Sequence, residues 1–183
     1  TTVDISDVEL DALNAGTGDY HGATLALGRN GGPNVGDVFG FVDGNGISFV
    51  GGSLFKNGQT IATFDIVSTP GELAIAFTSA NGETPTSADV DFILSQITYG
   101  NTSVAPPASV QVDWTFSDGN TGSQGSGGPE QVIGSTTVAI TSVNSAPTAG
   151  GNGGSVAENG SVEIGVLAND SDIAGVLVPA SGQ

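Results

Sequence analysis

Short runs in which apolar and polar residues alternate recur along most of the chain, with turn-forming residues between them. Alternation with a period of two is typical of β-strands that bury one face. The pattern predicts strands near residues 2–10, 23–29, 36–42, 46–50, 53–56, 60–67, 72–78, 96–100, 108–116 and 131–143. Because these strands are short and follow one another directly, we expect an all-β fold, an antiparallel β-sandwich.

The strand expected at 108–116 shows the alternation most clearly. Its apolar positions are Val110, Val112, Trp114 and Phe116, and polar residues stand between them. One face of this strand should therefore lie in the core and the other in water. We expect Trp114 to anchor the core, and an exposed Trp114 on which a sugar could stack is the alternative.

Asn-Gly pairs supply the positive φ angles that tight hairpin turns require. Gly44-Asn45-Gly46 predicts a hairpin between the third and fourth strands, and Asn57-Gly58 predicts another between the fifth and sixth. Both turns would join neighbouring strands of one sheet.

One segment has the period of a helix instead. Thr86 stands at an N-cap position with Asp89 three residues on, and the apolar residues that follow are Val90, Ile93, Leu94 and Ile97. This spacing places an apolar stripe on one side of a capped helix. We expect one short helix that covers an end of the sandwich.

Apolar content falls away across residues 144–154, which are rich in Gly, Ala, Ser and Asn. We therefore expect a β-sandwich module at 1–146, a Gly-rich linker at 147–154, and a further segment at 155–183. That last segment is either the start of a second module or a β segment donated to a neighbour.

Within this last segment, Ser161–Leu167 alternates and predicts a strand, and residues 175–178 predict a weaker one. Two strands bury too little to be stable alone in water. We expect them to be ordered through contact with the body of their own chain, the rest of a second module, or another subunit that accepts the strand.

The charge of the chain restricts its partners. Nineteen Asp and Glu residues against two Lys and Arg residues give a net charge of −17. Nucleic acids and anionic membrane surfaces are therefore excluded, and cations are the expected partners. The chain has no cysteine, which excludes disulfides, thiolate metal sites and cysteine nucleophiles. It has no apolar run of about 18 residues, so no membrane insertion is expected.

The acidic residues form small clusters rather than one block. They are Asp4, Asp7, Glu9 and Asp11; Asp89 and Asp91; Asp113 with Asp118 and Asn120; and Asp170 with Asp172. Ca²⁺ takes six to eight oxygen ligands from such side chains and from loop carbonyls, so calcium is the predicted ion. The alternative interpretation is a set of Asx turns on a solvated face. The spacing of an EF-hand loop does not occur.

No catalytic constellation stands out. His21 is the only histidine and lies in a Gly-rich turn without a nucleophile motif beside it. The sequence does not single out a carboxylate pair for glycoside hydrolysis. We therefore expect a protein that is not an enzyme.

Four stretches resemble the cadherin-like repeat modules of large bacterial surface proteins and adhesins. Val112–Asn120 and Ser135–Pro147 look like the end of one repeat. Ser155–Val162 and the Val166–Asp172 stretch, with its Leu-Ala-Asn-Asp-Ser-Asp segment, look like the start of the next. The resemblance covers most of the chain and implies an Ig/cadherin-like sandwich.

In that family, calcium is often bound near module junctions. The resemblance points to five metal ligands: Asp118, Asn144, Glu158, Asp170 and Asp172. One departure concerns the junction itself, where Ser145 stands in place of the family's usual Asp.

The leading hypothesis is a structural or adhesive module of an extracellular bacterial surface protein or fibre, stabilised by calcium. Its expected partners are neighbouring repeats or identical subunits in head-to-tail strand exchange, and cell-surface glycans. A carbohydrate-binding module, which exposed aromatic side chains on one face would favour, is the alternative hypothesis. A fragment of a hydrolase is the third.

Overall fold

The computed structural model describes residues 3–143 and 146–173. The chain divides into two units, one formed by residues 1–102 and 109–139 and the other by 103–108 and 140–183. The expected linker at 147–154 therefore lies inside the second unit. Whether residues 155–183 begin a second module stays a prediction. The two units are described one after the other.

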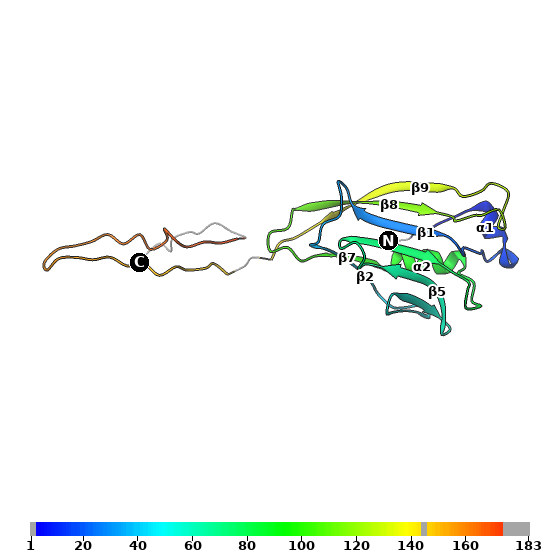
Figure 1. The fold of residues 1–183 in the computed structure, drawn as a ribbon, viewed down its shortest axis with the longest axis horizontal. Coiled ribbons are helices and arrows are strands. Elements are labelled where there is room, and N and C mark those ends of the chain that lie inside the picture. The colour runs from blue at the N-terminus through cyan, green and yellow to red at the C-terminus, as the bar shows by residue number, and fades with distance from the viewer. Residues whose placement is uncertain (1–2, 144–145, 174–183) are drawn as a thin grey trace. The chain divides into compact units, whose positions relative to one another are not determined.

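The first unit is built on an antiparallel sheet whose strands lie in the order β3-β4-β5-β6-β1-β8-β9 (Figure 1). Its strands are β1 (Thr24–Arg29), β3 (Ile47–Val50), β4 (Ser53–Lys56), β5 (Gln59–Asp65), β6 (Glu72–Phe77), β8 (Ser109–Ser117) and β9 (Gln131–Ala139). The all-β class expected from the alternation is confirmed.

A second layer covers one face of this sheet. It contains the two-stranded sheet of β2 (Asp37–Phe41) and β7 (Ile97–Asn101), together with helix α2 (Ser87–Ser95) (Figure 1). The covered face presents the alternate residues of the central strands, and Leu25, Ile75 and Phe116 are buried there. The arrangement is sandwich-like. No helix within the described residues is long and apolar enough to cross a membrane.

Strand β8 shows how the alternation becomes a packed layer. Val110, Val112 and Phe116 are buried, and Trp114 on the same face is half-buried. Trp114 lies opposite Gly134 of β9, and a Cβ at Gly134 would collide with the indole ring. The strand therefore places Trp114 on its covered face but only half-buried, with the ring over Gly134, which has no side chain.

Helix α2 begins as its sequence predicts. The Thr86 hydroxyl accepts a hydrogen bond from the Asp89 backbone N–H, and the Asp89 carboxylate accepts one from the Thr86 backbone N–H. This capping box satisfies two donors that the first helical turn leaves unpaired. Val90 and Ile93 form the buried side of the helix.

The strand expected at 2–10 is wrong. Asp7 caps a short helix there, α1 (Val8–Ala12), by accepting hydrogen bonds from the backbone N–H groups of Glu9 and Leu10. A 3₁₀ turn, η1 (Asn14–Gly16), follows. The side-chain cap offers the backbone local partners, and these compete with strand pairing.

The first expected hairpin is also wrong, although its turn forms. Asn45 and Gly46 have positive φ angles, and the backbones of Gly44 and Ile47 bond to each other. The flanking strands nevertheless separate: β2 pairs with β7, and β3 pairs with β4. The second expected hairpin, at Asn57-Gly58, does join β4 to β5.

The second unit contains no strand within its described residues, so the strand expected at Ser161–Leu167 is wrong. Two extended segments instead face each other through the single bridge Thr148–Ser171 and a few side-chain hydrogen bonds. Most apolar side chains among its described residues are exposed and none is buried, so these residues form no core. The weaker strand expected at 175–178 lies outside the described residues.

Candidate functional site

The five predicted metal ligands are not gathered into one described site. Asp118, in the loop after β8, is buried and its carboxylate accepts hydrogen bonds from the backbone N–H groups of Asn120 (3.1 Å) and Glu130 (2.9 Å). This carboxylate therefore holds the ends of its own loop together.

The other four belong to the second unit or lie outside the described residues. The Asp170 carboxylate accepts a hydrogen bond from the Gly150 backbone N–H at 2.7 Å, Asp172 is half-buried, and Glu158 is exposed in a turn. Asn144 lies outside the described residues. Within residues 3–143 and 146–173, no three acidic or histidine side chains converge on a point where a metal ion could sit. Calcium binding by these residues stays a prediction.

The fold brings together acidic side chains that the sequence keeps far apart. Asp91 of α2 accepts a hydrogen bond from the Ile5 backbone N–H at 2.7 Å, and Asp11 accepts one from the Tyr20 hydroxyl at 2.7 Å. Burial raises the pKa of Asp91, and the negative charges of Asp4 and Asp11 raise it further. Burial and the Asp11 carboxylate likewise raise the pKa of the Tyr20 hydroxyl. The amino-terminal cluster and the helix cluster are therefore electrostatically coupled.

A buried ion pair joins the two layers of the first unit. The guanidinium of Arg29, on β1, donates two hydrogen bonds to the Asp37 carboxylate of β2, at 2.6 and 2.7 Å. The same carboxylate accepts hydrogen bonds from the Tyr99 hydroxyl (2.6 Å) and the Asn101 amide (2.8 Å), both on β7. Asp37 is 4% exposed. The hydrogen bonds from Arg29 hold the pKa of this carboxyl below its ordinary value.

The acid dependence of stability should report this ion pair. A carboxyl whose pKa is lower in the folded chain stabilises the fold above its unfolded pKa, about 3.9, and this contribution is lost as pH falls through the folded pKa. We expect Asp37→Asn to flatten the dependence of the unfolding free energy on pH below about 4, measured by urea denaturation at several pH values. Parallel curves for the two proteins would contradict the assignment.

The single lysine also forms ion pairs inside the first unit. The ammonium of Lys56, on β4, lies 2.7 Å from an Asp89 oxygen and 3.4 Å from a Glu83 oxygen. Hydrogen bonds to these two carboxylates raise the pKa of Lys56 against the opposing effect of burial. Asp89 thus serves both as a helix cap and as an ion-pair partner.

His21 also has a carboxylate partner. Its Nδ1 atom lies 2.8 Å from an oxygen of Asp19, and the Gln124 amide lies 3.2 Å from the same nitrogen. The Gln124 amide also donates to the backbone carbonyls of Asp19 and His21. Neither neighbour is a nucleophile, and the arrangement fixes the loop against the residues that follow β8.

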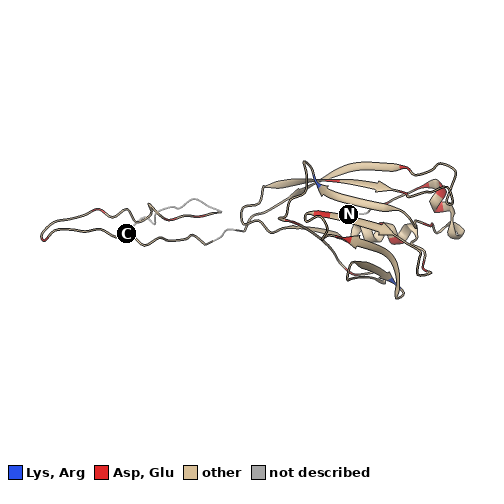
Figure 2. Cartoon of the chain, in the orientation of Figure 1, with Lys and Arg blue, Asp and Glu red and all other residues tan. Residues whose placement is uncertain are grey.

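Every basic side chain is therefore used inside the first unit. Among the described residues, these basic side chains form ion pairs with the carboxylates of Asp19, Asp37, Glu83 and Asp89. Figure 2 shows the remaining acidic positions spread over both ends of this unit and along the chain. The sequence indicates the excess of negative charge, and the structure adds that no basic side chain of the described residues is left to reduce it.

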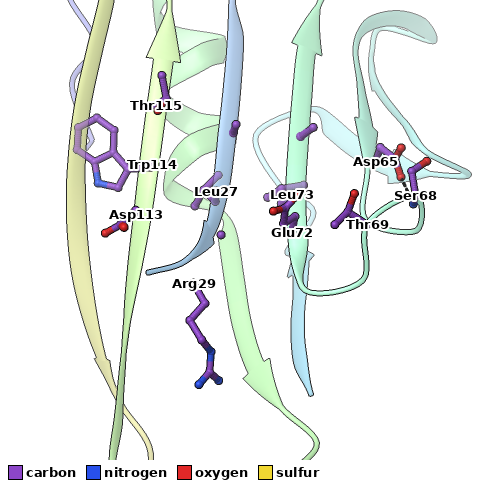
Figure 3. Close-up of a pocket in the computed structure, with 13 residues that line it drawn as sticks. Leu27, Arg29, Asp65, Ser68, Thr69, Glu72, Leu73, Asp113, Trp114 and Thr115 are labelled. Carbon is purple, nitrogen blue, oxygen red and sulfur yellow. Dashed lines mark hydrogen bonds between the residues drawn. The ribbon is translucent and has the colours of Figure 1, made fainter. Parts of the chain in front are cut away.

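The outer face of the large sheet carries a shallow trough of about 300 Å³ (Figure 3). Small residues of the central strands, Ala26, Gly28 and Ala74, lie under it. The Asp65 and Asp113 carboxylates stand at its sides, and each already accepts hydrogen bonds from neighbouring groups of the chain. These bonds lower the pKa of both carboxyls, so both are ionised at neutral pH. The trough is negatively charged and suits a cation or a polar ligand rather than an apolar one.

The feature that would favour carbohydrate binding is not present. All eleven aromatic residues of the chain lie within the described residues, and each is buried or half-buried. In Figure 3 the Trp114 ring points toward β9 rather than into the trough. Most of the aromatic rings pack on one another or in the core, as Phe41 does between Phe49 and Phe64.

Comparison with known proteins matched no family model, no curated protein and no solved structure.

Proposed function

We propose that this chain is a structural module of an extracellular bacterial surface protein or fibre, and that bound calcium stabilises it. The observation that carries the proposal is the charge balance. The chain has a net charge of −17, and both of its Lys and Arg residues are already held in internal ion pairs. Cations that offset the remaining repulsion must come from solution.

Two further observations support a structural role. Among the described residues, no buried side-chain nitrogen or oxygen lacks a hydrogen-bond partner. The polar groups of the interior are thus used to hold loops, layers and helix ends, as Asp37, Asp89 and Asp118 are. The sequence resemblance to cadherin-like modules points in the same direction. Calcium sites of extracellular modules are weak, with dissociation constants of about 10⁻⁴–10⁻³ M.

The test is thermal unfolding of the whole chain in EDTA and in millimolar calcium at matched ionic strength. A site with a dissociation constant of about 10⁻⁴–10⁻³ M would add roughly 0.4–1.4 kcal/mol to the free energy of unfolding at millimolar free calcium, so we expect a higher melting temperature with calcium. Sodium chloride at the same ionic strength is the control for screening. Equal melting temperatures in EDTA and calcium would overturn the calcium part of the proposal.

Variants locate the ion. If the resemblance identifies the ligands, Asp170→Asn and Asp172→Asn should reduce the calcium-dependent rise in melting temperature. Asp65→Asn, at the edge of the trough on the large sheet, removes the same charge elsewhere and should leave the rise unchanged. If only Asp65→Asn removes the calcium-dependent rise in melting temperature, the ion binds in the trough instead.

A further inference from the structure

Strand β9 is an unprotected edge. It forms the last strand of the large sheet and pairs with β8 in an unbroken register from Ser117–Gln131 to Ser109–Ala139. Within the described residues no strand pairs with its other side. Proteins usually protect such an edge with charged side chains, proline, a bulge or a very short strand. Strand β9 has nine residues and none of these features, whereas the opposite edge, β3, has only four residues.

An apolar groove of about 280 Å³ runs beside this edge, where the second layer stops short of β9. Its lining includes Leu27, Leu94, Trp114, Thr136 and Val138, and no charged residue. Trp114 is half-buried there, while Thr136 is exposed. A strand added at β9 would therefore gain backbone hydrogen bonds from the edge and an apolar surface for every second side chain.

The second unit contains a segment with the matching pattern. Residues 161–165 form neither helix nor turn, and a turn follows at 166–169. Val162, Ile164 and Val166 stand at alternate positions of the sequence, with exposed fractions of 44%, 46% and 62%. Within the described residues, the segment is held by contacts such as the hydrogen bond from the Asn152 amide to the Val166 carbonyl at 3.0 Å. Its length is close to that of β9.

The charge distribution selects these two surfaces for contact between copies. Two chains of charge −17 repel each other wherever acidic surfaces meet. Strand β9 and its groove carry no charge, and residues 161–167 carry only Glu163. Contact at these surfaces thus avoids most of the repulsion that would oppose association elsewhere.

We propose that residues 161–167 of one copy add as a strand to the free edge of β9 in a second copy, with Val162, Ile164 and Val166 over the groove. This inference rests on the proposed structural function and names its partner. Donor and acceptor are different surfaces of one chain, so the contact is head-to-tail and repeats from copy to copy into an open fibre.

The test measures the mass of the full chain by light scattering over a range of concentrations in calcium. We expect the mass to rise to at least twice the 17.9 kDa of one chain. Ile164→Glu should abolish association by placing a charge on the donor, and Thr136→Glu should do so by placing one on the acceptor. Both side chains are exposed, so both variants should melt like the unmodified chain at concentrations where that chain is monomeric. Val67→Glu, at a loop position that is 79% exposed, is the matched control and should still associate.

Mixing the two variants gives the sharpest outcome. Thr136→Glu keeps an intact donor and Ile164→Glu keeps an intact acceptor, so the mixture should form dimers and stop there. A mixture that stays monomeric overturns the proposal. An unmodified chain that is monomeric at every concentration also overturns the proposal. This includes a monomer whose melting temperature Ile164→Glu lowers, because that result would mean that the segment folds onto β9 of its own chain. A monomer whose melting still depends on calcium would remove this inference and leave the proposed function standing.

Discussion

Replacing Asp37 with alanine is expected to lower the free energy of unfolding by about 3 kcal/mol, the lower end of the range for breaking a buried ion pair. The Asp37 carboxylate is 1% exposed, and its Arg29 partner, at 22%, keeps some contact with water. The substitution leaves the guanidinium without its anion and removes the acceptor that the Tyr99 hydroxyl and the Asn101 amide share. Because Arg29 comes from β1 of the large sheet, the two layers lose the bonds that join them there, and Tyr99 and Asn101 lose an acceptor within the β2–β7 sheet. Urea denaturation at neutral pH measures the loss.

The control for Asp37→Ala removes a negative charge that the fold does not use. The Glu130 side chain is exposed and takes part in none of the ion pairs of the first unit. Glu130→Ala should change the unfolding free energy by less than about 0.5 kcal/mol. If both variants lose the same amount, the cost of Asp37→Ala comes from something other than the buried ion pair.

Ile75→Ala is expected to cost about 2–5 kcal/mol of unfolding free energy, the range for a large-to-small change in a packed core. Ile75 is 2% exposed in the middle of β6, where it lies between Leu25 of β1 and Phe64 of β5. Central strands on both sides limit how far the cavity can close, so the cost should not fall below this range. Thermal and urea unfolding of the variant measure it.

Ile133→Ala makes the same chemical change at a position that is 75% exposed. Ile133 lies on β9 opposite Thr115, on the face of the sheet that the second layer does not cover. We expect a change within about 0.5 kcal/mol. A similar cost at both positions would mean that the large sheet buries its other face as well, against the arrangement described above.

The two units differ in the interactions that stabilise them. The first unit has a buried apolar face, a layer-joining ion pair and capped helices, so it has the interactions that a stable fold needs. The second unit has exposed valines and one backbone bridge. We expect its order to depend on its contacts, and the proposed strand addition to β9 of a second copy would be one such contact.

The local features of the fold could be predicted from the sequence. The alternation at 108–116 gives β8 and its inward residues, and Thr86 with Asp89 gives the start of α2. Both depend on residues a few positions apart, and such interactions are the same in any fold. The strand expected at 2–10 failed on a local interaction of the same kind, since the Asp7 cap fits a helix better than a strand.

The pairing of strands could not be predicted from these patterns. The turn at Gly44–Gly46 forms as its residues dictate, yet the strands on either side join different sheets. A turn fixes the direction of the chain over four residues, whereas pairing depends on which surfaces the whole chain can bury together. The alternation at 161–167 likewise marks a strand-forming segment, but a strand requires an edge that the described residues of the second unit do not provide.

For the site, the sequence by itself determined the charge: nineteen acids, two strong bases and no cysteine make external cations the natural partners. Only the tertiary structure decided which carboxylates are already used. Asp37 meets Arg29 and Tyr99 across two layers, and Asp91 meets the backbone of Ile5, although no spacing along the chain indicates either contact. The physical reason is that composition sums over the chain regardless of order, while a hydrogen bond or an ion pair requires two groups to meet at about 3 Å. In an all-β fold, the packing of distant strands sets those meetings.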